Sequence, residues 1–401
     1  MSQGDSTVII GAVQGDRSDA LASLTPEMAG RLTAKGHHVV IARGLGIQAG
    51  WEDAAYDASG AQVVDDGAVL KTADVLTFAE PPTDPGRFKQ ARPGTLLVGM
   101  VRPHTIPEEV LKAWCGARLS AVSLDAIPRL SRAQSMDVLS SLSTVMGYRA
   151  VMVAAERLRK FFPLLMTAAG TIPPARVLVL GAGVAGLQAI ATAHRLGAVV
   201  EAFDTRPEVK EQVESVGGRF LTVDVQASGT ADGYANALDQ DAETEEVKRL
   251  ADPVERADVV VTTAQIPGRS APILITQSMI ERMRPGSVII DLSALTGGNT
   301  ALTRPDQEIV HNGVRIVGLT RAYQDLPGDT SRLYAKNLTT FLEYLIAEGL
   351  ERDDSHLVKL PDDELVNRTI MMDRGQPVSP VIQSRLTSIE AEGCAANVPG
   401  R

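Results

Sequence analysis

The sequence contains few cysteines, histidines and aromatic residues, and each shortage argues against a class of site. Its two cysteines, Cys115 and Cys394, form no CxxC pair, and its six histidines include no HxxxH pair. Disulfide frameworks and zinc sites of those patterns are therefore not expected, and both thiols are expected to be free. Aromatic residues make up only 4% of the chain, which argues against a platform for stacking nucleobases.

The chain also lacks clustered basic residues and a long uninterrupted apolar run. Its formal net charge is −10, and no block of Lys and Arg follows a phosphate backbone, so nucleic acid is not an expected partner. The N-terminal residues show no basic segment followed by an apolar core, and no stretch reaches the roughly 18 to 20 apolar residues of a membrane span. A cytoplasmic location is expected.

What is present points to an α/β protein. At 401 residues the chain exceeds what one hydrophobic core usually supports, so two domains are expected. In the N-terminal third, short β-branched runs alternate with amphipathic helical stretches, which predicts a mostly parallel sheet. A helix is predicted over Pro26–Ala34, capped by Thr25. The predicted strands are Thr7–Val13, Val39–Ala42, Ala61–Val64, Asp74–Phe78, Thr95–Met100 and Leu119–Ser123.

The rest of the chain continues this pattern after a long helical stretch. A helix is predicted over Ser135–Met166, followed by a Gly/Pro loop over Gly170–Pro174, and a further helix begins near Tyr334. The polar, acidic segment from Gln226 to Glu246 is either a solvated loop or a mobile lid. The later predicted strands are Val177–Leu180, Val199–Phe203, Val259–Thr263, Ser287–Leu292 and Val314–Gly318.

The strongest motif is a GxGxxG turn between a buried strand and an Ala-rich helix. Gly181 permits the tight turn, Gly183 lets a pyrophosphate approach the backbone, and Gly186 lets the helix pack on the strand. The phosphates would lie at the start of a helix that begins near Val184, where the helix dipole favours anions. A GxGxxG turn alone also occurs for packing reasons, but here strand, helix and second strand are all present. The pattern predicts a dinucleotide site.

Asp204 ends the second strand of this unit, about 20 positions after the glycines. A carboxylate there accepts hydrogen bonds from the adenosine ribose and repels a 2′-phosphate, so NAD is favoured over NADP. Arg206 leaves an alternative open, because an arginine beside the ribose could accept NADP. Two residues past the strand, it is otherwise a surface or adenine-stacking group.

Several long runs resemble one known family. They resemble the NAD(H)-binding α subunit of proton-translocating NAD(P) transhydrogenase, to which alanine dehydrogenase is related. The expected fold is α/β, with two Rossmann-like, doubly wound parallel-sheet domains and a cleft between them. An alanine-dehydrogenase-like domain of residues 1–140 plus 321–401 and an NAD(H)-binding domain of residues 141–320 are expected. The resembling runs are Pro128–Ser141, Met166–Ala198, Lys210–Phe220, Pro285–Asn299 and Leu333–Leu338.

The resemblance implies specific site residues. It implies that Arg129, Gln134, Asp137 and Ser140 hold the nicotinamide for hydride transfer, although spacing alone favours an ordinary capped helix start at the first three. It also implies that Tyr234 folds onto the bound nucleotide and that the loop Val261–Gly268 flanks it. The expected cofactor-binding residues are Gly181, Gly183, Val184, Ala185, Gly186, Asp204, Thr205, Arg206, Tyr234, Thr263, Ala264, Gln265 and Asn299.

The chain departs from both families where an alanine dehydrogenase binds its substrate. Without the usual cations, a carboxylate pocket and a side-chain acid/base are missing, whereas hydride exchange between two nicotinamides needs chiefly close positioning. Gln265 also replaces a usual leucine, and Leu295 replaces a polar residue. The missing groups are a Lys-Glu pair at Gln14 and Gly15, an arginine at Leu21, a lysine at Phe78 and a histidine at Gly99.

Three functions remain open at this point. The first is a dimeric NAD(H)-binding component that exchanges hydride with NADP(H) on a partner subunit and docks onto membrane-embedded subunits, peripheral to the inner membrane. The second is a stand-alone NAD-dependent oxidoreductase with a small-molecule pocket built from Gln14, Phe78, Gln265 and Arg321. The third is a non-catalytic NAD(H) sensor. The sequence favours them in this order.

Overall fold

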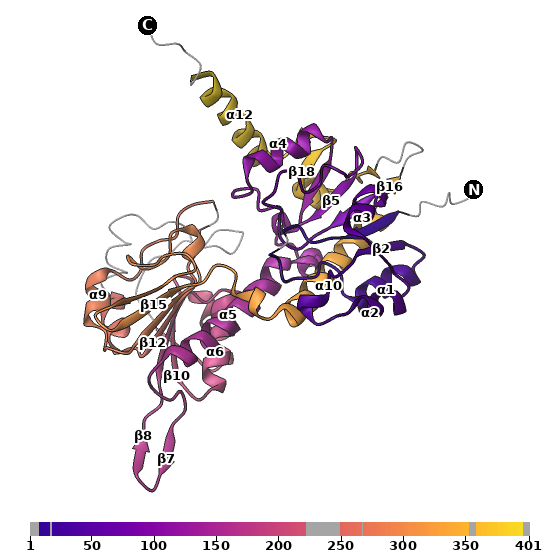
Figure 1. The fold of residues 1–401 in the computed structure, drawn as a ribbon. Helices are drawn as coiled ribbons and strands as arrows, with labels where there is room; N and C mark the ends of the chain where they lie inside the picture. The colour runs from indigo at the N-terminus through magenta and orange to yellow at the C-terminus, as the bar shows by residue number, and fades with distance from the viewer. Residues whose placement is uncertain (1–7, 17, 222–248, 267, 353–357, 396–401) are drawn as a thin grey trace. The chain divides into compact units, whose positions relative to one another are not determined.

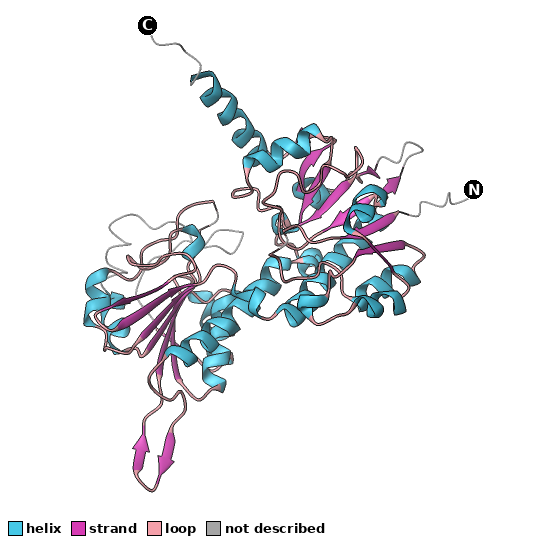
Figure 2. Ribbon diagram, in the orientation of Figure 1, coloured by secondary structure: helices cyan, strands magenta, loops and turns pink. Residues whose placement is uncertain are grey.

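A computed structural model describes residues 8–16, 18–221, 249–266, 268–352 and 358–395 of the chain (Figure 1). The chain divides into two compact units, one formed by Met1–Leu142 with Gln324–Arg401 and the other by Ser143–Tyr323. Each unit contains a largely parallel sheet with helices (Figure 2). The predicted α/β class with parallel-sheet domains is confirmed.

The sheet of the first unit has the strand order β19-β18-β6-β5-β4-β1-β2-β3. Strands β1 to β6 pair in parallel, and all six coincide with predicted strands to within one or two residues at either end. The antiparallel strands β18 and β19 were not predicted. The bounds are β1 Ile9–Ala12, β2 His38–Ala42, β3 Gln62–Val64, β4 Val75–Thr77, β5 Leu96–Gly99, β6 Ser120–Ser123, β18 Ile370–Asp373 and β19 Gln376–Pro377.

The helices of the first unit begin where their caps require. The helix α1 spans Pro26–Ala34 as predicted, because the Thr25 hydroxyl accepts the Met28 N–H at 3.3 Å. Helix α10, Pro327–Ala347, begins earlier than the predicted start near Tyr334, because proline suits a first helical turn. The other helices are α2 Asp53–Ala58, α3 Asp66–Thr72, α4 Glu108–Gly116, α11 Glu364–Thr369 and α12 Pro380–Ala395.

The second unit contains a seven-stranded sheet of order β11-β10-β9-β12-β13-β15-β14. All its pairings are parallel except that of β14 with β15. Strand β14 was not predicted. The bounds are β9 Arg176–Leu180, β10 Val199–Phe203, β11 Arg219–Phe220, β12 Val259–Thr262, β13 Val288–Asp291, β14 Glu308–His311, β15 Val314–Gly318, α6 Val184–Arg195, α7 Lys210–Ser215 and α9 Gln277–Arg282.

The long predicted helix is shorter than its apolar pattern indicates. Helix α5 spans Val138–Arg157 and does not reach Met166. Pro163 lacks an N–H and disfavours helical geometry at the residue before it, so the helical pattern cannot continue through it. Instead, β7 Leu165–Thr167 and β8 Gly170–Ile172 form a hairpin that projects from the second unit (Figure 1). The prediction of a loop at Gly170–Pro174 is therefore wrong over β8.

Helix α5 also changes one expectation about membranes. Among the described residues it is the one helix long and apolar enough, by length and composition, to cross a membrane, although none was expected. Half of the qualifying window is buried inside the structure, and the core helix of a soluble protein passes the same test. The segment is therefore weak evidence for a span.

Candidate dinucleotide site

The glycine turn between β9 and α6 has a different constraint at each glycine. Gly181 has φ +99°, and a Cβ on it would lie 2.4 Å from the Thr263 hydroxyl oxygen. A Cβ on Gly186 would lie 1.9 Å from the carbonyl oxygen of Gly181, so the helix contacts the turn directly. A Cβ on Gly183 would meet nothing within 4 Å. The turn is thus closely packed at both ends and open at Gly183, where the predicted pyrophosphate would approach.

The first turn of α6 faces this opening. Gly183 is the N-cap and has no side chain to accept a hydrogen bond, and the first turn, which includes Val184 and Ala185, contains no acidic residue. The first N–H groups of an α-helix have no partners within the helix, and they favour a bound anion. The residues present therefore fit a pyrophosphate at this point.

The Asp204 carboxylate, at the end of β10, is held by four hydrogen bonds. Its Oδ1 accepts the Arg206 backbone N–H at 2.9 Å and the Arg206 Nε–H at 3.0 Å. Its Oδ2 accepts the Ala182 N–H at 2.7 Å and an Arg206 terminal N–H at 3.1 Å. The hydrogen bonds from Arg206 to Asp204 raise the pKa of the guanidinium. Thr205 lies between them and is half-buried. This contact between Asp204 and Arg206 was not predicted from the sequence.

Loops after β12 and β13 are joined by hydrogen bonds around Ala264. The buried Asn299 side chain accepts the Ala264 N–H at 3.1 Å and donates to the carbonyl oxygens of Ala264 at 2.9 Å and Pro272 at 2.8 Å. The Gln265 amide donates to the Leu292 carbonyl at 3.1 Å. The Thr263 hydroxyl donates to the Gly181 carbonyl at 3.1 Å. The residues predicted from Gly181 to Asn299, Tyr234 excepted, thus lie on one sheet and its adjoining loops.

Sequence reasoning missed Asp291, the last residue of β13. This fully buried carboxylate accepts the Ser293 N–H at 2.9 Å, the Asn299 N–H at 2.7 Å and the Thr303 hydroxyl at 2.6 Å. Gly298, with φ +86°, leaves room for it, because a Cβ there would lie 2.8 Å from its Oδ2. An acidic residue at the end of a parallel strand is the signal that singled out Asp204, and it applies equally to Asp291.

The residues expected to hold the nicotinamide belong to the first unit. Arg129 and Gln134 are exposed on the segment before α5. Asp137 accepts the Ser140 N–H at 2.9 Å and the Ser140 hydroxyl at 2.6 Å, which is the geometry of a capped helix start. The Asn337 amide on α10 donates to the Ser135 carbonyl at 2.8 Å and fastens this segment. The arrangement leaves the nicotinamide role of these residues as a prediction.

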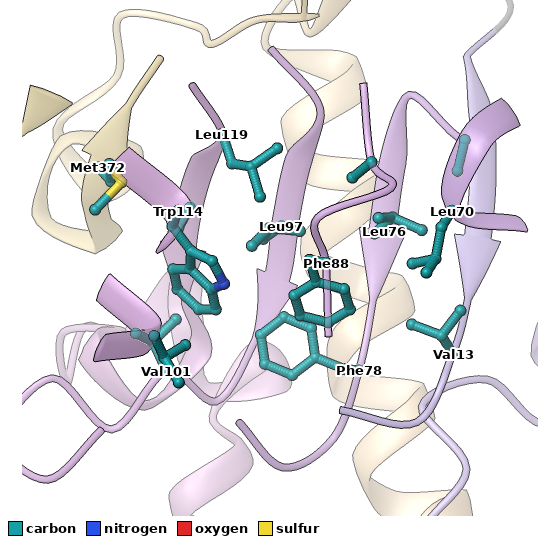
Figure 3. Close-up of a cluster of buried hydrophobic side chains, with 14 of the residues drawn as sticks. Val13, Leu70, Leu76, Phe78, Phe88, Leu97, Val101, Trp114, Leu119 and Met372 are labelled. Carbon is teal, nitrogen blue, oxygen red and sulfur yellow. The ribbon is translucent and has the colours of Figure 1, made fainter. Parts of the chain in front are cut away.

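The family departures in the first unit fill space rather than open a pocket. Phe78 is fully buried between Phe88 and Trp114, with ring centroids 5.8 and 6.5 Å away (Figure 3). A Cβ on Gly99 would lie 2.7 Å from the Phe78 ring, so the two departures depend on each other. Leu21 is also fully buried. A hydrophobic core occupies the positions where the families usually have a lysine and an arginine.

The other departures and site residues lie in varied surroundings. Gly15 is buried, and the Gln14 amide donates to the Asp19 carbonyl at 2.9 Å. Arg321 and Leu295 are exposed residues of the second unit. Tyr234 lies outside the described residues. In the described part of the chain, no group of three His, Cys, Asp or Glu side chains could hold a metal ion.

Comparison with known proteins agrees with this geometry. The chain matches the family Alanine dehydrogenase/PNT, the N-terminal domain over residues 16–146 and the C-terminal domain over residues 150–380. The first segment of the two-segment NAD(P) transhydrogenase subunit alpha of Rickettsia prowazekii is 38% identical over 382 residues, which cover 94% of this chain and 97% of the relative. The protein of the same name in Rhodospirillum rubrum is 41% identical over 373 residues, which cover 90% and 94%.

A solved structure and a more distant relative complete the comparison. The transhydrogenase from Sinorhizobium meliloti is 36% identical with a TM-score of 0.79, and the match covers 93% of this chain and 99% of that one. Alanine dehydrogenase of Bacillus subtilis is 26% identical over 281 residues, which cover 69% of this chain and 68% of the relative. The resemblance indicated by the sequence is confirmed, with transhydrogenase nearer than alanine dehydrogenase.

Proposed function

Because the chain belongs to the alanine dehydrogenase/PNT family, we propose that it binds NAD(H) and exchanges hydride with NADP(H) held by a partner subunit. The observation that carries the proposal is the turn at Gly181, Gly183 and Gly186, closely packed at its ends and open before α6. The bound nicotinamide would supply or accept the hydride. The chain's own residues would anchor the pyrophosphate at α6 and the adenosine ribose at Asp204.

Two features favour hydride exchange over turnover of a small carboxylate. The relatives named as transhydrogenase subunits are 38% to 41% identical, against 26% for the alanine dehydrogenase. Phe78 is fully buried, so it does not line the small-molecule pocket that a stand-alone oxidoreductase would need. Direct exchange between two nicotinamides needs no side-chain proton shuttle, which suits a chain that lacks the usual lysine and histidine at Phe78 and Gly99.

The test is a binding and turnover experiment on two glycine variants. Gly183→Ala places a methyl group in the open space before α6, whereas Gly116→Ala places one in open space at the end of α4. Both glycines have negative φ, so neither variant strains the backbone. Gly183→Ala is expected to weaken NADH binding by about 10-fold or more, which corresponds to about 1.4 kcal/mol. Gly116→Ala should bind as the parent does, and equal binding by both variants would contradict the proposed pyrophosphate position.

Turnover distinguishes hydride exchange from the other functions. The protein, mixed with a transhydrogenase NADP(H)-binding domain, is expected to reduce NADP⁺ or an analogue with NADH. Turnover of NAD by the chain alone with a small carboxylate would favour a stand-alone oxidoreductase. Binding without turnover in either assay would favour a sensor.

The location and assembly of the protein follow from the same proposal. A cytoplasmic chain peripheral to the inner membrane, docked on membrane-embedded subunits, suits the relatives named as subunits. A homodimer is supported by the β7–β8 hairpin, on which Met166 is 78% exposed, because an isolated two-stranded hairpin is marginally stable in water. Sedimentation of Met166→Glu against the parent tests this, and a dimeric variant would remove the hairpin as the contact.

A further inference from the structure

Every acceptor position of the Asp204 carboxylate is occupied in this structure. A carboxylate offers about four lone-pair sites, and Asp204 accepts four hydrogen bonds, three of them from Arg206 and one from the Ala182 N–H. The Asp204 side chain is only 7% exposed, so little of it is left to contact a ligand. A ribose diol that donates to Asp204 therefore has to displace an existing donor.

The four donors differ in how easily they can leave. The N–H groups of Ala182 and Arg206 belong to the backbone of the glycine turn and of the residue after Thr205, and moving them would deform the site. The two bonds from the Arg206 guanidinium, at 3.0 and 3.1 Å, come from a side chain that reorients by rotamer changes alone. That side chain is 19% exposed, so it has solvent on one side. The two guanidinium bonds also equal in number the two hydroxyl groups of a ribose diol.

We propose that Arg206 is a latch on Asp204, which the adenosine ribose of NAD(H) displaces when it binds. In the empty site the guanidinium occupies the two carboxylate positions that the ribose hydroxyls later take, while the two backbone N–H groups hold the carboxylate in place throughout. Arg206 is then a specificity-determining residue that competes with the ligand instead of contacting it through Asp204. This inference rests on the proposed NAD(H) site.

The latch and a purely structural role of Arg206 predict opposite effects of its removal. If Arg206 only positions Asp204, Arg206→Ala leaves the carboxylate less ordered and weakens binding. If Arg206 is a latch, the backbone donors still position Asp204, and binding no longer has to break a partly exposed ion pair. Such pairs contribute up to about 1 kcal/mol, so the dissociation constant for NADH should fall about three- to five-fold.

The experiment measures dissociation constants for NADH and ADP-ribose by titration calorimetry. ADP-ribose keeps the adenosine diol and lacks the nicotinamide, so the latch predicts the same gain for both ligands. Arg219→Ala is the matched control, because Arg219 pairs with Glu201 in the same sheet and its loss removes one positive charge without touching Asp204. The control should bind within about two-fold of the parent, since exposed pairs contribute little.

A second background ties the gain to Asp204. In Asp204→Asn the carboxylate is gone, so adding Arg206→Ala should no longer tighten binding. Arg206→Lys, which cannot form the two-pronged contact, should give part of the gain and serves if the alanine variant does not fold. Unchanged or weaker binding by the Arg206 variants, in a parent that binds NADH, overturns the latch alone. A parent that binds neither ligand overturns the proposed NAD(H) site itself.

Discussion

The hydroxyl of Tyr334 on α10 donates a 2.8 Å hydrogen bond to the carbonyl oxygen of Phe78, which follows β4. The two residues are separated by 256 positions in the chain, and both are fully buried. Burial raises the pKa of Tyr334 well above its ordinary value, and the negative charge of Glu80 raises it further. The hydroxyl therefore keeps its proton and remains a donor, so the bond fastens the C-terminal segment to the first sheet.

Tyr334→Phe should destabilise the protein without changing its size. The variant leaves the buried Phe78 carbonyl without this donor, and an unsatisfied buried polar group costs about 1 to 3 kcal/mol. Chemical denaturation measures the loss in the free energy of unfolding. Tyr148→Phe is the control, because Tyr148 is 39% exposed and its change should cost little. Equal stabilities of the two variants would contradict the role given to the Tyr334 hydroxyl.

Gly99→Ala should destabilise the first unit through overpacking. The added methyl group would lie 2.5 Å from the Phe78 carbonyl oxygen and 2.7 Å from its ring, and overpacking a core typically costs about 1 to 3 kcal/mol. Adding Phe78→Leu should recover part of the loss in thermal unfolding, because it removes the ring that the methyl group meets. A double variant no more stable than Gly99→Ala would show that the ring is not what limits the space.

Asp291→Asn should loosen the loops near the candidate site. The amide replaces one acceptor oxygen with a donor among the N–H and hydroxyl groups that Asp291 now accepts, and hydrogen bonds to a charged group contribute about 1.5 to 3 kcal/mol. Since Asn299 is one of those donors and holds Ala264, NADH affinity should fall together with stability. The exposed Asp252 provides the control variant Asp252→Asn. Undiminished stability of Asp291→Asn would rule out this role.

Acidification should weaken the contact between α1 and α10. The Glu343 carboxylate accepts hydrogen bonds from Arg31 at 2.5 and 2.7 Å and lies 2.9 Å from Lys35. Burial alone would raise the pKa of Glu343, but these cationic partners lower it overall. A group whose pKa is lowered by folding stabilises the protein above its unfolded pKa, about 4.3 for glutamate, and that contribution is lost as the pH falls through the lowered value.

The measurement for this pair is the pH dependence of Glu343→Gln against the parent. Arg31 is 42% exposed, so the parent should be more stable by only about 0.5 to 1 kcal/mol near pH 7. The difference should disappear at pH values below the lowered pKa of Glu343. Glu364→Gln removes an exposed helix pair with Arg368 and should show a smaller difference. A gap between parent and Glu343→Gln that stays constant down to acid pH would contradict the assignment.

Local sequence signals predicted the elements whose causes are local. The β-branched runs that became β1 and β9, the cap at Thr25 and the glycine spacing around Gly183 each act within a few residues of the chain. Strands β14 and β18 were missed because each is a short antiparallel strand that depends on a partner elsewhere. The end of α5 was misplaced because its apolar pattern continues into a hairpin that the helix cannot enter.

The sequence by itself determined the family, the alternation of strands and helices, and the open glycine turn, because these depend on residue order and backbone freedom. Only the tertiary structure decided that Arg206 occupies the acceptor positions of Asp204, that Asp291 holds the loop of Asn299, and that Phe78 joins an aromatic core. Hydrogen bonds and packing contacts depend on where side chains meet in space, and residues far apart in the chain reach those positions only when the sheets form.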